Sequence, residues 1–346
     1  MAGANWTVGL VGPGAIANIH AAAIAAVDGL RLVAIAGGAP GRATELGEGI
    51  AHFADTAAML AGARPDIVVI MTPSGDHYAP ARLALAAGCH VVVEKPLAVD
   101  AKEAARLAFL AQDSGRVCAT ISQRRYEPAH QAIKALLDAG TLGTLRLVEA
   151  DVHWWRSDAY YAEKPWRGSA AQGGGSLFNQ GIHSLDLMLF FAGRVRSVAG
   201  MVATVGHRID VEDLAGALLA FDGGAMGVIV TSTATPPGSG AGFRLFTSRG
   251  HCALDQDRIT EWSFEGVPKP ETATAGGSGA SDPMAIGISG HVQQWTDIRD
   301  AIREGRPAAI TFEDGAAAAR VINAIYLAAR ERRQVELAEF PEHLEG

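Results

Sequence analysis

The sequence predicts an α/β protein of two domains: a doubly wound parallel sheet, followed by an α+β domain with a large, mostly antiparallel open sheet. Three observations predict this. The chain has 346 residues, too many for one domain of roughly 100–200 residues. Up to residue 123, short apolar runs alternate with helix-length stretches. Beyond it, longer strands follow one another with few helices between them. We therefore expect domains at 1–123 and 124–346.

The strand candidates of the first domain are apolar on both faces. Several are rich in Val and Ile, which is typical of a parallel sheet covered by helices. Ligands of such sheets bind at the carboxyl ends of the strands. The expected strands are 6–11, 30–36, 67–71, 91–93 and 117–121, and the expected helices are 16–27, 42–49, 77–87 and 101–113.

The second domain reads as strands in series. Several alternate in polarity or connect through hairpin signals such as Asp222-Gly223-Gly224. The segment 266–290 is rich in Gly, Pro, Ser and Ala, and we expect a long loop that is mobile or functional. The expected strands are 145–153, 195–205, 214–221, 225–235 and 243–247, and the expected helices are 128–139, 177–191, 291–304 and 314–333.

Composition and charge exclude several classes of protein. Lys and Arg number 29 against 37 Asp and Glu, a formal net charge of −8 without a basic stripe, which excludes a nucleic-acid binder. No run approaches about 18 apolar residues and no signal-peptide pattern is present, so we expect a cytoplasmic protein with no membrane partner. The three cysteines have no C-x-x-C spacing and are expected to be free buried thiols rather than disulfides or zinc ligands.

A glycine loop follows the first expected strand. Gly12-Pro13-Gly14-Ala15-Ile16-Ala17 lies between a strand and a helix, the context that the dinucleotide fingerprint requires. Gly12 permits the tight turn, Gly14 lets the backbone approach a pyrophosphate, and Ala17 lets the helix pack on the strand. The N–H groups at the helix start then hold the anion. The alternative is a plain turn.

The end of the second strand favours NADP slightly over NAD. Folds of this type carry an acid about 20 residues on, which binds the ribose hydroxyls. Here the strand is followed by Gly37-Gly38-Ala39-Pro40-Gly41-Arg42, without Asp or Glu. An uncharged segment at the end of this strand, with Arg42 beside it, tolerates the 2′-phosphate of NADP. The alternative is that Arg42 is a solvated residue of the first helical turn.

Two further strand ends point to the same edge of the sheet. Thr72-Pro73-Ser74-Gly75-Asp76-His77 follows the strand 67–71, and Glu94-Lys95-Pro96 follows the strand 91–93. Burial lowers the pKa of a lysine such as Lys95 toward the range useful for proton transfer, whereas Glu94 favours its charged form. We predict that Lys95 donates and accepts a proton beside a nicotinamide. The alternative is a lysine that only caps the strand.

A mostly apolar helix carries three polar residues. In Gly173-Gly174-Gly175-Ser176-Leu177-Phe178-Asn179-Gln180-Gly181-Ile182-His183-Ser184-Leu185-Asp186, α-helical spacing places Asn179, His183 and Asp186 on one stripe. Asp186 could orient the imidazole of His183. The alternative is a core histidine satisfied by Asp186. Because no second histidine is nearby, we expect no metal site.

Aromatic residues and arginines follow the first strand of the second domain. Strand alternation places His153 and Trp155 on one face, and Val152 and Trp154 on the other. Aromatic rings beside arginine suit a sugar ring with an anionic substituent. Packing on the sheet or on an oligomer partner is the alternative. The candidate substrate contacts are Arg124, His153, Trp155, Tyr160, Trp166 and Arg167.

These motifs together resemble the glucose–fructose oxidoreductase / inositol dehydrogenase / MocA-type family. The glycine loop, Thr72-Pro73 with His77, Glu94-Lys95-Pro96 and the histidine helix occur in order over nearly the whole chain. The resemblance implies an N-terminal Rossmann domain and NAD(P)-dependent oxidation or reduction of a sugar, cyclitol or related polyol. It also implies a C-terminal domain whose open sheet mediates a homodimer or homotetramer.

The resemblance also implies roles for residues. Lys95 is then the catalytic acid/base, His183 its partner at the reacting hydroxyl, and Pro96 shapes the nicotinamide pocket. Thr72, Pro73 and His77 line the cofactor site. Inositol-type members carry Asp four residues before the histidine, where this chain has Asn179. An amide cannot accept a proton, so any relay runs through Lys95 and His183, while Asn179 can still hydrogen-bond a hydroxyl.

Two other functions stay open. One is a regulator that binds NAD(P) without catalysis, and the other is an NAD-assisted glycoside hydrolase in which the cofactor oxidises and re-reduces one sugar carbon. The presence of both Lys95 and His183 favours a dehydrogenase.

Overall fold

Two β-sheets, each in its own unit, organise the chain. The computed structural model describes residues 5–272 and 287–340. Within these ranges the first unit comprises residues 5–123 and 288–316, and the second comprises 124–272, 287 and 317–340. The sequence pattern predicts that 288–316 belong to the second domain, whereas their contacts lie with the first unit.

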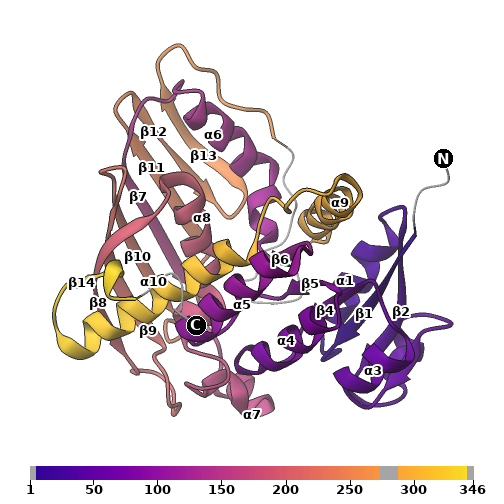
Figure 1. The fold of residues 1–346 in the computed structure, drawn as a ribbon. Coiled ribbons are helices and arrows are strands. Elements are labelled where there is room, and N and C mark those ends of the chain that lie inside the picture. The colour runs from indigo at the N-terminus through magenta and orange to yellow at the C-terminus, as the bar shows by residue number, and fades with distance from the viewer. Residues whose placement is uncertain (1–4, 273–286, 341–346) are drawn as a thin grey trace. The chain divides into compact units, whose positions relative to one another are not determined.

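The first unit contains a six-stranded parallel sheet of order β3-β2-β1-β4-β5-β6 (Figure 1). The strand order reverses between β1 and β4, which is the topological switch point of a doubly wound fold. β4 is fully buried, because helices cover both faces. The strands are β1 (Trp6–Val11), β2 (Leu30–Ala36), β3 (Ala51–Phe53), β4 (Ile67–Ile70), β5 (His90–Val93) and β6 (Cys118–Thr120).

The helices of this unit follow the predicted alternation, with one omission. β3 and the helix α3 after it were not predicted, because a three-residue strand shows no periodicity. Asp55 and Asp100 cap α3 and α5, each accepting backbone N–H bonds. The helices are α1 (Ala17–Ala25), α2 (Arg42–Leu46), α3 (Thr56–Gly62), α4 (Tyr78–Ala86) and α5 (Ala101–Ser114).

A helix from late in the chain completes the first unit. α9 (Ser289–Glu304) buries Trp295, Ile298 and Ala301 in the same core as Val8 and Ile24. The side chain of Gln294 accepts from the backbone N–H of Ser122 at 3.1 Å and donates to the carbonyl of Thr120 at 2.8 Å. These apolar contacts and hydrogen bonds explain why α9 belongs with the first sheet.

The second unit contains an eight-stranded sheet of order β13-β12-β11-β7-β10-β9-β8-β14. Every neighbouring pair is antiparallel except β7 with β10. β12 and β13 form a hairpin that the sequence analysis did not predict. The strands are β7 (Leu145–His153), β8 (Val195–Ala203), β9 (Leu214–Phe221), β10 (Met226–Ser232), β11 (Ala241–Thr247), β12 (Gly250–Asp255), β13 (Arg258–Phe264) and β14 (Val335–Glu336).

Helices cover one face of this sheet (Figure 1). They are α6 (Pro128–Asp138), α8 (Ile182–Ala192) and the part of α10 (Phe312–Glu331) that belongs to this unit. The covered face carries Val148, Ala150 and Val152 of β7, all buried. The opposite face exposes 80% of Met201 and 52% of Met226.

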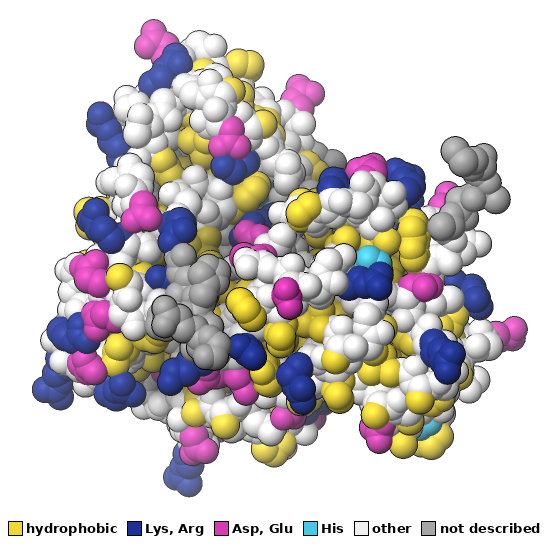
Figure 2. Space-filling model, viewed as in Figure 1, with side chains coloured by type: hydrophobic (Ala, Val, Ile, Leu, Met, Phe, Trp, Pro, Cys, Tyr) yellow, Lys and Arg dark blue, Asp and Glu magenta, His cyan; other side chains and the backbone are white. Residues whose placement is uncertain are grey.

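Of the predicted loop at 266–290, residues 273–286 lie outside the described ranges, and α9 begins at Ser289. Within the described ranges, no helix combines the length and apolar character needed to cross a membrane. On the face shown in Figure 2, acidic and basic side chains are interspersed.

Candidate functional site

The glycine loop lies at the switch point of the first sheet. Gly12 has φ +75°, and a Cβ on it would lie 2.7 Å from the Cα and the N of Thr72, so no other residue fits. A Cβ on Gly14 would meet nothing closer than 3.9 Å, which leaves this side of the turn open to an anion. Ala17 is fully buried at the start of α1. The loop therefore has the geometry that pyrophosphate binding requires.

Arg42 braces this loop. Its guanidinium donates to the carbonyls of Pro13 and Gly14, at 3.1 and 3.0 Å, and to Oδ1 of Asn18 at 2.8 Å. A further N–H binds Glu45 at 2.8 Å. Arg42 is thus not merely a solvated residue, and most of its donors already serve the loop. Its charge stays beside the turn where a nucleotide phosphate is expected.

His77 joins the two other strand-end turns. One ring nitrogen lies 2.9 Å from the carbonyl oxygen of Thr72, and the other lies 2.7 Å from that of Pro96. Burial lowers the pKa of His77, and the two carbonyls, which can only accept, oppose this change. The side chain is almost fully buried. His77 therefore links the backbone of the turn after β4 to that of the turn after β5 through a buried side chain.

Glu94 is held by a chain of hydrogen bonds that the sequence analysis missed. Its Oε1 lies 2.9 Å from Nε2 of His20 on α1, and Nε1 of Trp295 on α9 donates to Nδ1 of His20 at 3.1 Å. Burial raises the pKa of Glu94, but the hydrogen bond from His20 and the positive charge of Lys95 oppose this change, and the pKa lies below its ordinary value. Two residues from distant parts of the sequence, His20 and Trp295, thus stabilise one buried carboxylate.

Lys95 follows Glu94 just beyond the carboxyl end of β5. Its backbone N–H donates to Oε2 of Glu94 at 3.1 Å. Burial lowers the pKa of Lys95 and the carboxylate of Glu94 opposes this change, as the sequence analysis expected. The side chain remains partly exposed. A lysine with a lowered pKa gives up its proton more readily than an exposed lysine does, and it can take a proton back once neutral.

His20, Glu94 and His291 are close enough to reach one metal ion, since their ligand atoms lie within 4.8 Å of one another. A metal-binding imidazole normally donates its second N–H to an acceptor. Trp295 can only donate, so Nδ1 of His20 accepts, and a metal at Nε2 would leave that ring without a proton. The donor set does not fit a metal ion.

In the second unit, Gly173-Gly174-Gly175 packs against the helix that carries His183. A Cβ on Gly175 would overlap Glu212, and a Cβ on Gly174, which has φ +66°, would lie 2.6 Å from Phe178. The helix begins with a π-helical turn, Leu177–Gly181, before α8. Because a π turn bonds residue i to i+5 rather than to i+4, the segment that carries Asn179 departs from the α-helical spacing on which the predicted stripe rests.

Arg125 binds the carboxylate that was expected to orient His183. Its Nε and Nη2 donate to the two oxygens of Asp186 at 2.8 and 2.7 Å, and both side chains are buried. His183 itself is 8% exposed. Asn179 donates to the carbonyl of Gly174 at 2.7 Å, which ties the π turn to the glycine turn. The guanidinium of Arg125 thus neutralises Asp186.

Glu212 anchors the start of this helix. Its Oε1 accepts from the backbone N–H of Leu177 at 2.9 Å and from the hydroxyl of Ser176 at 3.3 Å. Its Oε2 accepts from the hydroxyl of Tyr326 at 3.0 Å. Burial raises the pKa of Glu212 to about 7. Only the absence of a side chain at Gly175 lets this carboxyl group approach so closely.

Part of the predicted substrate group lies on the short helix α7 (Asp158–Glu163) and in the 3₁₀ turn after it, Pro165–Gly168. The guanidinium carbon of Arg167 lies 4.0 Å from the ring centroid of Tyr160. Trp166, beside Arg167, is partly exposed, and Trp155 is 39% exposed. Arg124 donates to Gln256 at 3.1 Å.

Alternation along β7 determines the face of the sheet on which His153 lies. Val152 and Thr231, its partner on β10, are buried on the helix-covered face, where Thr231 bonds Ser176. His153 follows Val152 and so points to the opposite face.

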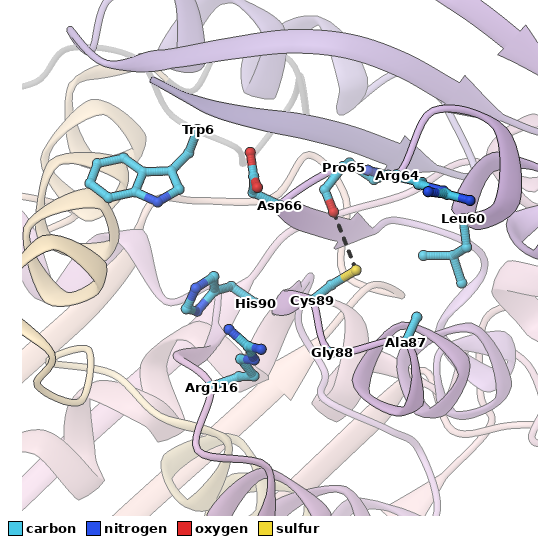
Figure 3. A pocket seen from close by; sticks show the side chains of 10 residues that line it. All are labelled: Trp6, Leu60, Arg64, Pro65, Asp66, Ala87, Gly88, Cys89, His90 and Arg116. Carbon is cyan, nitrogen blue, oxygen red and sulfur yellow. Dashed lines mark hydrogen bonds between the residues drawn. The ribbon is translucent and has the colours of Figure 1, made fainter. Parts of the chain in front are cut away.

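A hollow of about 500 Å³ opens at the other edge of the first sheet (Figure 3). It is lined by Trp6 and His90, the first residues of β1 and β5, and by Asp66 and Arg116 just before β4 and β6. The carboxylate of Asp66 already binds Thr7. Because dinucleotides bind at the carboxyl ends of the strands, this hollow is not the predicted cofactor site.

Comparisons with known proteins cover both units. The family model described as oxidoreductase family, NAD-binding Rossmann fold, matches residues 6–122, and the GFO/IDH/MocA C-terminal domain matches 130–253. The scyllo-inositol 2-dehydrogenase (NADP(+)) IolW of Bacillus subtilis (strain 168) is 26% identical over 79% of either chain. The rhizopine catabolism protein MocA of Rhizobium meliloti is 26% identical over 92% of this chain and 94% of its own.

A solved structure also resembles the chain. The WlbA dehydrogenase from Bordetella pertussis, in complex with NADH and UDP-GlcNAcA, is 29% identical with a TM-score of 0.86. The match covers 96% of this chain and 98% of that chain.

Glu212→Gln tests the anchor of the histidine helix. The raised pKa means that the neutral form is favoured in the folded state. Its contribution to stability is full below a pH of about 4.5 and is lost as the pH rises through about 7. Gln keeps the acceptor for Leu177 and cannot ionise. We expect the free energy of unfolding of the variant to fall less over this range, by up to about 3 kcal/mol.

Urea denaturation at several pH values measures this difference. Glu265→Gln, at an exposed position of the same unit, is the matched control and should leave the pH dependence unchanged. A Glu212→Gln variant with the pH dependence of the unaltered protein would contradict the assignment.

Proposed function

The chain belongs to the Gfo/Idh/MocA family of oxidoreductases, and from this premise we propose that it transfers a hydride between NAD(P) and a carbinol or keto carbon of a sugar, cyclitol or sugar derivative. The observation that carries the proposal is the position of Lys95. It follows β5 at the carboxyl edge of the same sheet whose β1 leads into the glycine loop. A group that can donate or accept a proton therefore lies at the edge where the nicotinamide cofactor is expected.

The chemistry requires one proton for each hydride. A bound nicotinamide supplies or takes up the hydride at its C4. In oxidation of the alcohol, the hydroxyl proton passes to the neutral amine of Lys95 while the hydride leaves the carbon that bears this hydroxyl, and in reduction the ammonium of Lys95 returns the proton to the new alkoxide oxygen. His183 is the second acid/base group. Asn179 forms a hydrogen bond to a hydroxyl of the substrate. It takes no part in proton transfer, because an amide is a poor base.

The cofactor is held by groups of the first unit. Backbone N–H groups of the glycine loop bind the pyrophosphate, while Thr72 and Glu94 lie at the ends of β4 and β5 near the nicotinamide half. His77 bonds the backbone of both turns. The proposed residues are Gly12, Gly14, Ala15, Ile16, Ala17, Gly37, Arg42, Thr72, Pro73, His77, Glu94, Lys95 and Pro96.

The substrate class we favour is a sugar that carries an anionic group. Arg167 stacked on Tyr160 of α7, with Trp166 beside it, offers a cation and an aromatic surface in one short segment of the second unit. The related WlbA dehydrogenase was solved with UDP-GlcNAcA. We assign substrate contacts to Arg124, His153, Trp155, Tyr160, Trp166 and Arg167.

We further propose a cytoplasmic homo-oligomer that associates through the open sheet. The exposed apolar residues Met201, Leu218 and Met226 lie on one face by strand register, opposite the helices. Cys89, Cys118 and Cys252 are buried free thiols, which suits a reducing compartment.

Lys95→Ala tests the catalytic assignment. General acid–base catalysis contributes about 10²–10⁴ in rate, so turnover should fall at least about a hundredfold. Cofactor affinity, measured by quenching of protein fluorescence, should stay nearly unchanged. Lys102→Ala, an exposed lysine on α5, is the control and should retain turnover.

The assay follows absorbance of the reduced nicotinamide with sugars, cyclitols and sugar nucleotides. Net reduction of the cofactor supports a dehydrogenase. Redox-neutral cleavage of a glycoside, or binding without turnover, would contradict it, as would an unaffected Lys95→Ala enzyme.

The cofactor itself is expected to be NADP in preference to NAD, by a modest factor. No acid follows β2 within Gly37–Arg42, and Arg42 places a positive charge beside the loop. Comparison of kcat/KM for the two cofactors measures the preference. A strong preference for NAD would contradict this assignment and leave the reaction class intact.

Leu218→Asp tests the oligomer interface. Leu218 is 50% exposed on the open face, so a carboxylate there should dissociate the assembly into smaller species in sedimentation-velocity runs. Leu83→Asp, an exposed leucine of α4, should not change the sedimentation coefficient. An unaltered protein that sediments as a monomer at micromolar concentration would rule out the interface.

A further inference from the structure

We propose that Trp295 and His20 are positioning residues that hold Glu94 as a carboxylate behind Lys95, with His20 as a neutral Nε2–H imidazole. The inference rests on the proposed function of Lys95. It assigns a role in proton transfer to a side chain of α1 and to one of α9, separated by 275 positions in the sequence.

The donor and acceptor roles follow from chemistry. The indole N–H of Trp295 can only donate, so Nδ1 of His20, 3.1 Å away, must accept and carries no proton. The remaining ring proton is then on Nε2, which donates to Oε1 of Glu94 at 2.9 Å. An imidazolium would have protons on both nitrogens and would lose the bond from Trp295. The indole therefore selects both the tautomer and the neutral state.

The surroundings of Glu94 require this donor. Its Oε2 accepts the backbone N–H of Lys95, and its Oε1 accepts from His20. The groups that face it are His20 from α1, His291 from α9, Lys95 of its own turn and His77 from the turn after β4. Burial raises the pKa of Glu94, and the hydrogen bond from His20 is the largest opposing effect.

His291 adds no positive charge to the cluster. Its ring lies edge-on to that of His20, with centroids 5.5 Å apart. Neither ring nitrogen has a hydrogen-bond partner among the described residues. Burial lowers the pKa of His291 to about 4, so it is neutral at neutral pH. With both imidazoles neutral, the negative charge of Glu94 acts on Lys95.

Lys95 depends on that negative charge. Burial lowers the pKa of its ammonium group, and Glu94 raises it. Without the donor from His20, the pKa of Glu94 would rise, so that a larger share of Glu94 would be protonated and Lys95 would lose part of its counter-charge. Lys95 would then become neutral at a lower pH, and its backbone would lose a charged acceptor.

Three variants test this chain of bonds. In His20→Gln, the amide oxygen can accept from Trp295 and the amide N–H can donate to Glu94, without a charge. In His20→Leu both bonds are lost. Trp295→Phe keeps the aromatic packing and removes only the indole donor, so it serves as the variant least disturbing to the fold. Thermal unfolding of each variant reports on structural damage separately.

The readout is the pH profile of kcat/KM, which reports ionisations of the free enzyme. For His20→Leu we expect the midpoint of the limb assigned to Lys95 to move to lower pH by at least about half a unit, with about a tenfold loss of turnover. Trp295→Phe should shift it in the same direction by less. His20→Gln should keep the midpoint and stay within about threefold of the unaltered enzyme.

Two kinetic outcomes would overturn the inference. One is a His20→Gln enzyme as impaired as His20→Leu, since that would require an imidazole or its cation. The other is lost turnover in His20→Leu and Trp295→Phe without a shift of the midpoint, which a merely structural role predicts. Stoichiometric metal in the purified protein, measured by elemental analysis, would also overturn it.

Failure of the proposed function has a different signature. If the proposed function is wrong, Lys95→Ala retains its activity. The limb of the pH profile then does not report the ionisation of Lys95, whatever the His20 variants do.

Discussion

A buried carboxylate at the carboxyl edge of the first sheet constrains the arrangement around it. An isolated ionised carboxyl group in a protein interior is costly, and it persists only where donors and counter-charges compensate it. For Glu94 the donors come from α1 and from the backbone of Lys95. α9 completes the arrangement, because Trp295 fixes the donor on His20. The same bonds place the partly buried Lys95 beside a negative charge, which ties the packing of the fold to its proposed chemistry.

In the second unit, the buried carboxyl groups are compensated in other ways. Asp186 is neutralised by a bidentate arginine, whereas Glu212 has hydroxyl and backbone donors, and its pKa is raised to about 7. The glycines at 173–175 let the chain pack within reach of Glu212. These contacts fix the start of the helix that carries Asn179 and His183. The histidine thus lies on a helix whose start is fixed by these contacts, which suits the acid/base role that we propose for it.

The sequence predicted what depends on local pattern. β7 and β9 begin and end at the predicted residues, because alternation and turn residues define them. Glu94-Lys95-Pro96 follows a buried strand as expected. β3 and β12–β13 were missed: β3 is too short for a periodic signal, and the polar, mostly exposed outer strand β13 carries little apolar alternation.

What the sequence could not show are contacts between distant segments. Nothing local indicates that α9 packs on α1, or that Trp295 bonds His20. His20 lies on α1 just beyond the glycine loop, and that is the one sequence signal that could have drawn attention to it. Arg42 was predicted near a phosphate, but its bonds to the loop carbonyls depend on the folded turn. The π turn likewise changes a spacing that an α-helix would have kept.

The protonation of His20 tests the account most directly. Nitrogen-15 NMR of histidine-labelled protein, with His20→Gln to assign the signals, distinguishes a protonated ring nitrogen from an unprotonated one. The bonds to Trp295 and Glu94 require a neutral ring with its proton on Nε2. A proton on Nδ1, or an imidazolium, would mean that Trp295 does not set the state of His20 and that Glu94 is held in some other way.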